Sequence, residues 1–290
     1  LVLASHMGRP KGQIVPELSL KPVAKRLSEL LGMPVRFVPD CVGEEADKAK
    51  EELKNGEILL MENLRFHGEE EKNDPKFAAA LIRGCDCAVN DAFGVSHRGH
   101  ASIVGVGKQM PMAAGLLLKK ETDFLGNALD HPARPFAAII GGAKIGDKIH
   151  VIANLIEKAD VIIIGGGMAN TFIAAEGFSM GKSLFDEAHF DLARGLMEKA
   201  EKRNVQLLLP VDFIAADKFA EDAKTKVCTA KEFPNQWMAL DIGPKTVKKY
   251  VDTLKKMKTV MWNGPMGVFE MKPFAKGTNS IAKALAKLDA

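Results

Sequence analysis

The sequence has few aromatic residues, few cysteines and no long apolar run. Aromatic residues make up only 6% of the chain, so any hydrophobic core must be mainly aliphatic. The four cysteines, Cys41, Cys85, Cys87 and Cys228, form no C-x-x-C pair, and their spacing suits neither a zinc site nor a disulfide framework. No apolar run approaches the roughly 20 residues of a membrane span, and no secretory signal is visible. We therefore expect a cytoplasmic protein with reduced thiols and no membrane partner.

An excess of charge of one sign is also absent. The chain has 40 basic and 37 acidic side chains, which gives a net charge of +3 at pH 7. This balance argues against a nucleic-acid partner or an acidic membrane surface as partner. Any positive charge that serves function must therefore be concentrated locally.

The order of apolar and amphipathic segments predicts two α/β domains. A domain usually has about 100–200 residues, and this chain has 290, of which 47% are hydrophobic. Short apolar runs alternate with segments of helical period, which is typical of βαβ units and of parallel sheets covered on both faces. The pattern restarts after the helical segment 116–135. We predict two doubly wound parallel-sheet domains, 1–118 and 119–290, joined by a helix near 119–131.

The second domain has its own series of apolar runs. The expected strands are 136–142, 160–167, 205–213, 237–244 and 259–269. The third of these runs leads into 214–234, which we expect to be irregular.

Basic side chains follow three apolar runs of the first domain. His6 and Arg9 follow the first run, Arg65 follows the run at 57–61, and the stretch NDAFGVSHRGHAS contributes Arg98 and His100. Ligands of open parallel sheets bind at the carboxyl ends of the strands. Guanidinium groups bind phosphate and carboxylate oxygens through paired planar hydrogen bonds. This edge is therefore predicted to bind a small, highly charged anion.

Glycine turns follow three runs of the second domain. GGAKIGDKI carries Lys144 and Lys148, GGGMANTF follows 160–164, and NGPMGVFE contains Asn263 and Glu270. Glycines let backbone N–H groups approach a phosphate, and a helix N-terminus favours negative charge. Together these turns indicate a nucleotide site. None of them matches the P-loop or the G-x-G-x-x-G fingerprint, which argues against a P-loop protein and an NAD-dependent oxidoreductase.

Other polar residues are expected to be structural. The acidic run EEEKNDP is predicted to approach a helix on the solvent side. Aspartates that follow strands are expected to cap helices or form turns: Asp40, Asp91 and Asp212. Four histidines are expected on the surface or in the core rather than as ligands: His67, His131, His150 and His189.

Nine segments, in this order and spacing, resemble the motifs of the phosphoglycerate kinase family. They are SHMGRP, ENLRFHGEEEKND, VNDAFGVSHRGHAS, GGAKIGDKI, GGGMANTF, GKSL, LPVDF, LDIGPKT and WNGPMGVFE. The resemblance covers essentially the whole chain. Met7, Gly99 and Gly146 replace residues that are commoner in the family, without removing a charged group.

The resemblance implies a role for each matching residue of the first domain. A patch that binds 3-phosphoglycerate is implied for His6, Met7, Gly8, Arg9, Arg65, Arg98 and His100. Arg65 and Arg98 are also implied to be catalytic.

In the second domain, the resemblance implies that Lys144 and Lys148 lie beside the transferring phosphate and are catalytic. The implied nucleotide-binding residues are Lys148, Gly166, Gly167, Gly243, Asn263 and Glu270. No residue of the chain is expected to be a metal ligand.

The implied enzyme is a monomeric, hinge-bending glycolytic kinase. It transfers a phosphoryl group reversibly between ATP and the carboxylate of 3-phosphoglycerate, with magnesium, giving 1,3-bisphosphoglycerate and ADP. Its partners are these small molecules.

Both ends of the sequence read as interruptions of a longer chain. The chain opens on LVLAS without methionine and ends within a helical pattern, and the family implies further segments upstream and downstream. A truncated kinase that binds ligands without turnover is the alternative if those segments are deleted.

Overall fold

The computed structural model describes residues 1–143, 146 and 148–288. The chain divides into two compact units, Leu1–Phe124 and Leu125–Ala290. The division falls inside helix α6 (Leu116–Asp130), which also contains the boundary predicted between residues 118 and 119. Along the described part of the chain, no helix has the length and apolar character that crossing a bilayer demands.

The first unit is built from short parallel strands with helices between them. Strands β1 (Val2–Leu3), β3 (Ile58–Met61) and β2 (Val35–Val38) pair in that order, and β4 (Ala88–Asn90) pairs with β5 (Met112–Ala114). The connecting helices are α1 (Lys21–Leu31), α2 (Glu44–Glu51), α3 (Gly68–Glu71), α4 (Pro75–Leu81) and α5 (Val106–Gln109).

Local sequence explains where these helices begin and end. Helix α1 carries Pro22 in its first turn and ends at Gly32, whose φ of 64° is left-handed. Helix α4 begins after Asp74, whose carboxylate accepts hydrogen bonds from the N–H groups of Lys76 and Phe77. These signals are local, so the sequence alone is enough to predict them.

The second unit contains a four-stranded parallel sheet. Its order is β12 (Thr259–Asn263), β6 (Phe136–Ile140), β7 (Val161–Ile164) and β8 (Gln206–Leu208). Its helices are α7 (Ile149–Leu155), α8 (Gly166–Ala175), α9 (Phe190–Lys202), α10 (Pro244–Leu254) and α11 (Lys276–Leu285).

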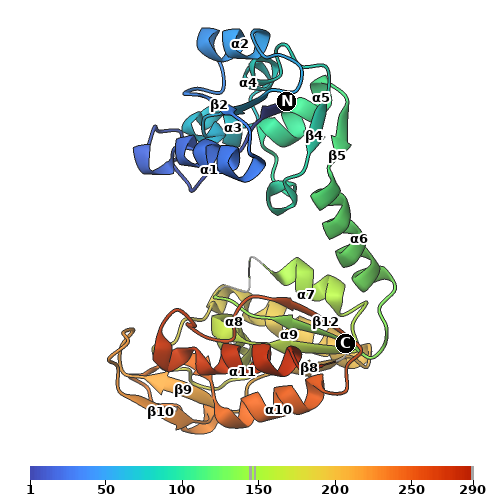
Figure 1. The fold of residues 1–290 in the computed structure, drawn as a ribbon. Coiled ribbons are helices and arrows are strands. Elements are labelled where there is room, and N and C mark those ends of the chain that lie inside the picture. The colour runs from blue at the N-terminus through green and yellow to red at the C-terminus, as the bar shows by residue number, and fades with distance from the viewer. Residues whose placement is uncertain (144–145, 147, 289–290) are drawn as a thin grey trace. The chain divides into compact units, whose positions relative to one another are not determined.

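Alternate residues of the central strands belong to two different cores. Phe136, Ala138 and Ile140 pack with residues of α7, α8 and α9, whereas Ala137 and Ile139 pack with residues of α10 and α11. Successive side chains of a strand point to opposite faces, so helices cover both faces of this sheet (Figure 1). The predicted doubly wound parallel architecture is therefore confirmed.

One part of the predicted second sheet is wrong. The expected strand at 237–244 is β11 (Met238–Ile242), and it lies in a separate antiparallel sheet with β9 (Phe213–Ala216) and β10 (Thr225–Cys228). Two of these strands lie within or overlap 214–234, which was expected to be irregular. These strands are only 4 or 5 residues long, so they carry too little periodicity to reveal their pairing.

Candidate active site

Three predicted basic residues of the first unit, Arg65, Arg98 and His100, act electrostatically on a fourth, His6. The pKa of the half-buried His6 is lowered, mainly because burial removes water from the ring. The positive charges of Arg65, His100 and Arg98 lower this pKa further, and the negative charge of Glu70 opposes them. Three segments, each following a strand, therefore place cationic groups in one neighbourhood, as the sequence predicts.

Arg65 is the most buried cation of this neighbourhood. It lies in the 3-10 turn η2 (Leu64–Phe66), directly after β3, and only 6% of its surface is exposed. One guanidinium nitrogen, Nη1, donates to the carbonyl oxygen of Gly8 over 3.0 Å. Its Nε is buried without a hydrogen-bond acceptor, and Glu71 Oε1 lies 3.7 Å away. A buried cationic donor without an acceptor is costly unless an anion binds there.

His100 is also buried, and an acidic partner holds it. His100 Nδ1 lies 3.6 Å from Glu70 Oε1, and Glu70 accepts hydrogen bonds from Ser102 N (2.9 Å) and Ser102 Oγ (2.6 Å). Glu70 is 3% exposed, so the expectation that its acidic run faces solvent is wrong for this residue. Sequence reasoning missed Glu70 because the neighbouring acidic residues, Glu69 and Glu71, do face solvent.

The segment that carries Met7, Gly8 and Arg9 is fixed by its backbone. Asn63 Nδ2 donates to the carbonyl oxygens of Met7 (2.8 Å) and Leu18 (3.0 Å). Gly8 has a φ of +66°, and a Cβ atom there would lie 2.8 Å from the Leu18 side chain. Met7 packs in a small core with Leu20 and Leu60. Arg9 and Arg98 are exposed, so these two guanidinium groups remain in contact with water.

A cavity of about 810 Å³ lies at the carboxyl ends of strands in the second unit. Three residues predicted to bind the nucleotide line it: Gly166, Gly167 and Glu270. Its other polar lining includes Asn170, Lys182 and Asp241. Apolar side chains make up much of the remaining wall: Phe185, Phe213, Phe219, Leu240, Ile242, Met266 and Val268. An apolar slot with few polar groups suits the flat ring of a nucleotide base.

Glycines let the backbones of three loops meet at this cavity. Gly142 N donates to Pro265 O over 3.2 Å, Gly166 N donates to Met266 O over 3.0 Å, and Met168 N donates to Gly142 O over 2.9 Å. Gly166 has a φ of +67°, and a Cβ atom there would lie 2.7 Å from Gly142 O. The loops after β6, β7 and β12 therefore form one hydrogen-bonded floor at the N-terminus of α8.

Lys148 lies at the ends of β6 and β12 but does not line the cavity. It precedes the first residue of α7, and its Nζ donates to Gly141 O over 2.8 Å. The same ammonium group forms a short hydrogen bond with Asn263 Oδ1. Asn263 therefore contacts the proposed catalytic lysine rather than the cavity. Lys144, the second predicted lysine, lies outside the described residues.

Gly243 has a structural neighbour instead of a place in the cavity wall. A Cβ atom at Gly243 would lie 2.3 Å from Asp212 Cγ. Gly243 N donates to Asp212 O over 2.8 Å, directly before α10 begins. The glycine therefore leaves room for the Asp212 side chain at the start of α10.

Sequence reasoning missed several cavity residues. Lys182 belongs to the segment GKSL, which was among the family motifs but received no role. It places a cation in the cavity wall, which the predicted Lys148 does not line. Phe219 and Asp241 come from the region around the antiparallel sheet, where the predicted pairing is wrong. Lys182 and Asp241 had a signal that could have been used, because GKSL and LDIGPKT are both among the family motifs.

Comparison with known proteins identifies the family. The sequence model described as phosphoglycerate kinase matches residues 1–290. The chain belongs to the phosphoglycerate kinase family. A phosphoglycerate kinase of Moorella thermoacetica is 55% identical over 289 residues, which are 100% of this chain and 74% of the relative. A cytosolic phosphoglycerate kinase of Triticum aestivum is 53% identical over 289 residues, which are 99% of this chain and 72% of that relative.

Solved phosphoglycerate kinases have the same fold. The structure from Coxiella burnetii matches with a TM-score of 0.82 and 40% identity, over 100% of this chain and 73% of that chain. The structure from Pyrococcus horikoshii matches with a TM-score of 0.80 and 33% identity, over 100% of this chain and 74% of that chain. The resemblance drawn from nine sequence motifs is confirmed.

Proposed function

We propose that this chain catalyses reversible phosphoryl transfer between ATP and the carboxylate of 3-phosphoglycerate. The products are 1,3-bisphosphoglycerate and ADP. Membership of the phosphoglycerate kinase family over the whole chain carries this proposal. The reaction places the enzyme in glycolysis, and its substrates are small molecules.

The basic patch of the first unit is proposed to bind 3-phosphoglycerate. Its members are His6, Met7, Gly8, Arg9, Arg65, Arg98 and His100. The buried Arg65 Nε without an acceptor supports this assignment, because a phosphate or carboxylate oxygen would satisfy it. The exposed Arg9 and Arg98 can turn toward the ligand without breaking a core contact. We assign Arg65 and Arg98 a second, catalytic role in neutralising charge.

The cavity of the second unit is proposed to bind ATP or ADP. Gly166 and Gly167 open α8 at its wall, and a helix N-terminus favours phosphate. Apolar side chains can cover the adenine, and the carboxylate of the exposed Glu270 can accept hydrogen bonds from ribose hydroxyls. Lys182 adds a cation to the same wall. Gly243 is proposed to support the site by positioning α10.

The chemistry requires no general base. The attacking carboxylate is ionised at neutral pH, so no proton has to be removed from it. One carboxylate oxygen forms a bond to the γ-phosphorus of ATP as the bond from that phosphorus to the β-phosphate oxygen breaks. Catalysis is then mainly positioning and charge neutralisation. We assign Lys148 to the transferring group, where its ammonium would exchange contacts with Gly141 and Asn263 for phosphoryl oxygens.

Magnesium is proposed to arrive with the nucleotide as a complex with ATP. Within the described ranges, the cavity has no group of three carboxylate, histidine or cysteine ligands close enough to hold a metal. Asp241, one of its carboxylates, already accepts hydrogen bonds from Gly277 N (2.7 Å) and Ile242 N (2.9 Å). The phosphate oxygens would therefore supply most of the ion's ligands.

The two binding sites are assigned to different units, so transfer requires that they meet. We propose a hinge-bending monomer that closes on its two substrates and excludes water, which would otherwise hydrolyse ATP. A cytoplasmic location is proposed by likeness to the wheat relative, whose name says cytosolic.

The proposal is tested by a coupled assay that follows NADH loss with ATP, magnesium and 3-phosphoglycerate. Lys148→Ala should lower kcat by about 10²-fold or more, because a cation that stabilises the transferring group is lost. Affinity for 3-phosphoglycerate should stay unchanged. Lys199→Ala, which removes a surface ion pair with Glu157, is the matched control and should keep full activity.

Two results would contradict these assignments. Loss of 3-phosphoglycerate affinity in Lys148→Ala, with kcat retained, would remove the lysine from the nucleotide side. A folded parent chain that binds both ligands without turnover would instead favour the inactive, ligand-binding alternative.

A further inference from the structure

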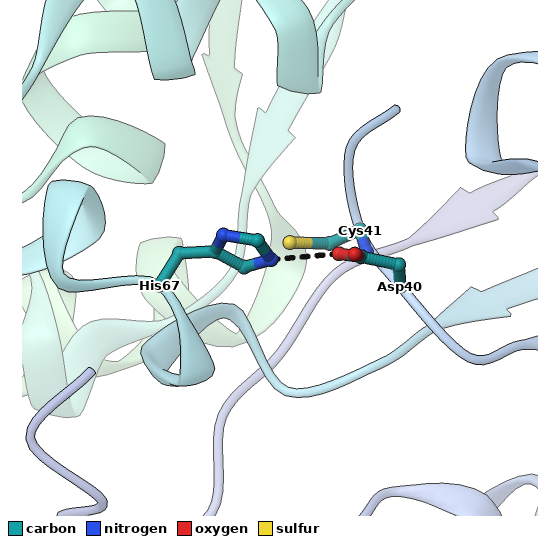
Figure 2. A group of neighbouring side chains, drawn as sticks. All are labelled: Asp40, Cys41 and His67. Atoms are coloured by element: carbon teal, nitrogen blue, oxygen red, sulfur yellow. Dashed lines mark hydrogen bonds and ion pairs between the residues drawn. The ribbon is translucent and has the colours of Figure 1, made fainter. Parts of the chain in front are cut away.

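The loop after β2 and the turn after β3 bring three different side chains together in the first unit. Strands β2 and β3 are parallel neighbours, so Asp40, Cys41 and His67 meet at the same edge of the sheet. Figure 2 shows the imidazole of His67 pointing at the Asp40 carboxylate, with the Cys41 sulfur beside both. One ligand atom from each residue lies within 4.8 Å of the other two.

The surrounding structure already holds each member of this group, which we call the Asp–Cys–His cluster. Asp40 Oδ1 accepts hydrogen bonds from the N–H groups of Cys41 (2.6 Å) and Val42 (3.3 Å). Cys41 is 1% exposed and packs in the main core of the unit. The His67 ring contacts Phe77 with 5.3 Å between ring centroids. Ordering these side chains when a ligand binds would therefore cost little free energy.

The thiol of the cluster is buried, whereas its histidine and its carboxylate are in contact with solvent. The side chains of His67 and Asp40 are 30% and 46% exposed, whereas Cys41 is buried. His67 Nε2 and Asp40 Oδ1 are 2.7 Å apart, so this pair is hydrogen-bonded when no other ligand is present. An ion entering from water would meet the histidine and the carboxylate first, and the sulfur behind them.

The three donor types together select a borderline-soft divalent cation. Sulfur, imidazole nitrogen and carboxylate oxygen are the ligands that zinc binds in proteins, and three protein ligands with a water complete its tetrahedron. Magnesium and calcium prefer oxygen ligands alone. We propose that Asp40, Cys41 and His67 form a zinc-binding site, distinct from the magnesium that accompanies ATP.

Zinc binding requires only small movements of these side chains. Zinc–ligand bonds of about 2.0–2.3 Å place the ligand atoms of a tetrahedral site roughly 3.3–3.8 Å apart. The His67–Asp40 pair must therefore open slightly, and the sulfur must close in from at most 4.8 Å. The Cys41 thiol proton passes to solvent. The proton on His67 Nε2, which bonds Asp40 in the free cluster, also leaves, and neutral His67 protonated on Nδ1 donates its Nε2 lone pair to the ion. The ion then ties the loop after β2 to the turn after β3.

The test titrates zinc into the metal-free full chain in competition with a chromophoric chelator. The titration uses a Cys85→Ser, Cys87→Ser background, so that the two more accessible thiols contribute nothing. We expect one zinc equivalent per chain. Affinity should fall by about 10²-fold in either Cys41→Ser or His67→Gln, because each variant removes a direct ligand. Zinc should also raise the unfolding midpoint of the parent but not of these variants.

Two variants serve as matched controls. Cys228→Ser removes the other buried cysteine, and His189→Gln removes a histidine that also pairs with an aspartate, Asp186, at 2.7 Å. Neither residue belongs to the cluster, so both variants should bind zinc like the parent.

A cobalt titration gives a second, independent readout. Cobalt(II) bound by Cys41 should produce a thiolate-to-metal charge-transfer absorption that Cys41→Ser lacks and His67→Gln weakens. Circular dichroism confirms that each variant is folded, and the partly exposed His67 decides the question if Cys41→Ser is not. Absence of zinc binding by the parent, equal binding in the folded His67→Gln variant, or a cobalt complex without thiolate absorption would each overturn the proposal.

Discussion

Buried charged side chains of this protein differ in whether their hydrogen bonds are complete. Glu62 accepts bonds from Ser19 Oγ (2.6 Å), Leu20 N (2.7 Å) and Asn63 N (2.7 Å), which is a fully structural arrangement. Arg65, two residues beyond Asn63, keeps a buried Nε without an acceptor. A buried donor that lacks a hydrogen-bond acceptor, with its ion-pair partner Glu71 at 3.7 Å, is more informative about a ligand than an exposed arginine.

Arg65→Ala and Arg98→Ala should each weaken 3-phosphoglycerate binding by about 2–5 kcal/mol, because one charge-assisted pair is lost. Nucleotide affinity should hardly change. Titration calorimetry with each ligand measures both effects. Arg83→Ala, which removes a surface pair with Asp47, is the control and should bind both ligands normally. Unchanged 3-phosphoglycerate affinity in both patch variants would refute the patch assignment.

Asp241 makes the free energy of unfolding of the second unit depend on pH. Burial raises the pKa of this carboxyl to about 7, although hydrogen bonds from Gly277 N and Ile242 N oppose the rise. In the unfolded chain the pKa is about 3.9. Between these values the folded state binds more protons than the unfolded state, so rising pH lowers the free energy of unfolding. The loss is on the order of 1 kcal/mol per pH unit and stops above about pH 7.

Asp241→Asn should remove this downward slope between about pH 4 and pH 7. The measurement is the urea midpoint followed by tryptophan fluorescence, which reports on the second unit because Trp237 and Trp262 both lie there. Asp222→Ala is the exposed control and should keep the slope of the parent. Equal slopes in the parent and Asp241→Asn would show that Asp241 stays ionised when folded.

At the scale of elements, α10 begins with a cap supplied from far along the chain. Both carboxylate oxygens of the buried Asp212 accept bonds from this helix, from Lys245 N (3.0 Å) and from Thr246 N (2.7 Å). The Thr246 hydroxyl also donates to Asp212 Oδ1 over 2.7 Å. Asp212 was expected to cap a helix or form a turn. It does cap a helix, but one that begins beyond the intervening antiparallel sheet.

Asp212→Ala should lower the free energy of unfolding by about 2–4 kcal/mol. The change removes the acceptor of the Lys245 N–H and of the buried Thr246 N–H at the start of α10, and it leaves the Thr246 hydroxyl with the Asp212 carbonyl oxygen. Urea unfolding followed by tryptophan fluorescence measures the loss. Asp222→Ala, which removes an exposed ion pair with Lys218, should cost less than about 0.5 kcal/mol. Equal costs in the two variants would mean that the cap contributes no more than a surface charge.

At the scale of the whole molecule, each unit has its own hydrophobic core. The largest core of the first unit contains Leu59, Met61 and Phe77, and the largest of the second contains Phe136, Ile162 and Phe172. A ligand stabilises the part of a protein to which it binds. Because the cores are separate, each substrate can reduce local unfolding, and so amide exchange, in the unit to which it binds.

Hydrogen exchange should separate the two ligands. 3-Phosphoglycerate should slow amide exchange within 1–118, most strongly around the basic patch. ATP with magnesium should slow exchange in the second unit around Gly166 and Gly167. Mass spectrometry of peptides from the intact chain measures both, with inorganic sulfate as an anion control for the patch. Protection of the second unit by 3-phosphoglycerate alone would contradict the assignment of ligands to units.

The sequence by itself determined the fold class and the family, and it predicted that basic residues of three segments lie together in the first unit. Alternation of apolar runs with amphipathic helices is a local signal. It predicted the parallel sheets, except that the run at 237–244 belongs to the antiparallel sheet. Basic residues directly after strands needed only the rule that parallel strands end at one edge, which placed Arg65, Arg98 and His100 near His6. The nine motifs were enough for the family.

Only the tertiary structure decided which residues meet across long separations. Of three consecutive glutamates, only Glu70 is buried, and the sequence does not distinguish it from the other two. The packing of three loops forms a cavity whose wall includes Lys182. The pairing of β9 with β10 and β11 depends on side chains distant in sequence, so short runs could not reveal it. Cys41 and His67 illustrate the same limit. The spacing of the cysteines argued against a zinc site. Spacing cannot reveal a cluster of one cysteine and one histidine, because these residues meet only where two strands end side by side.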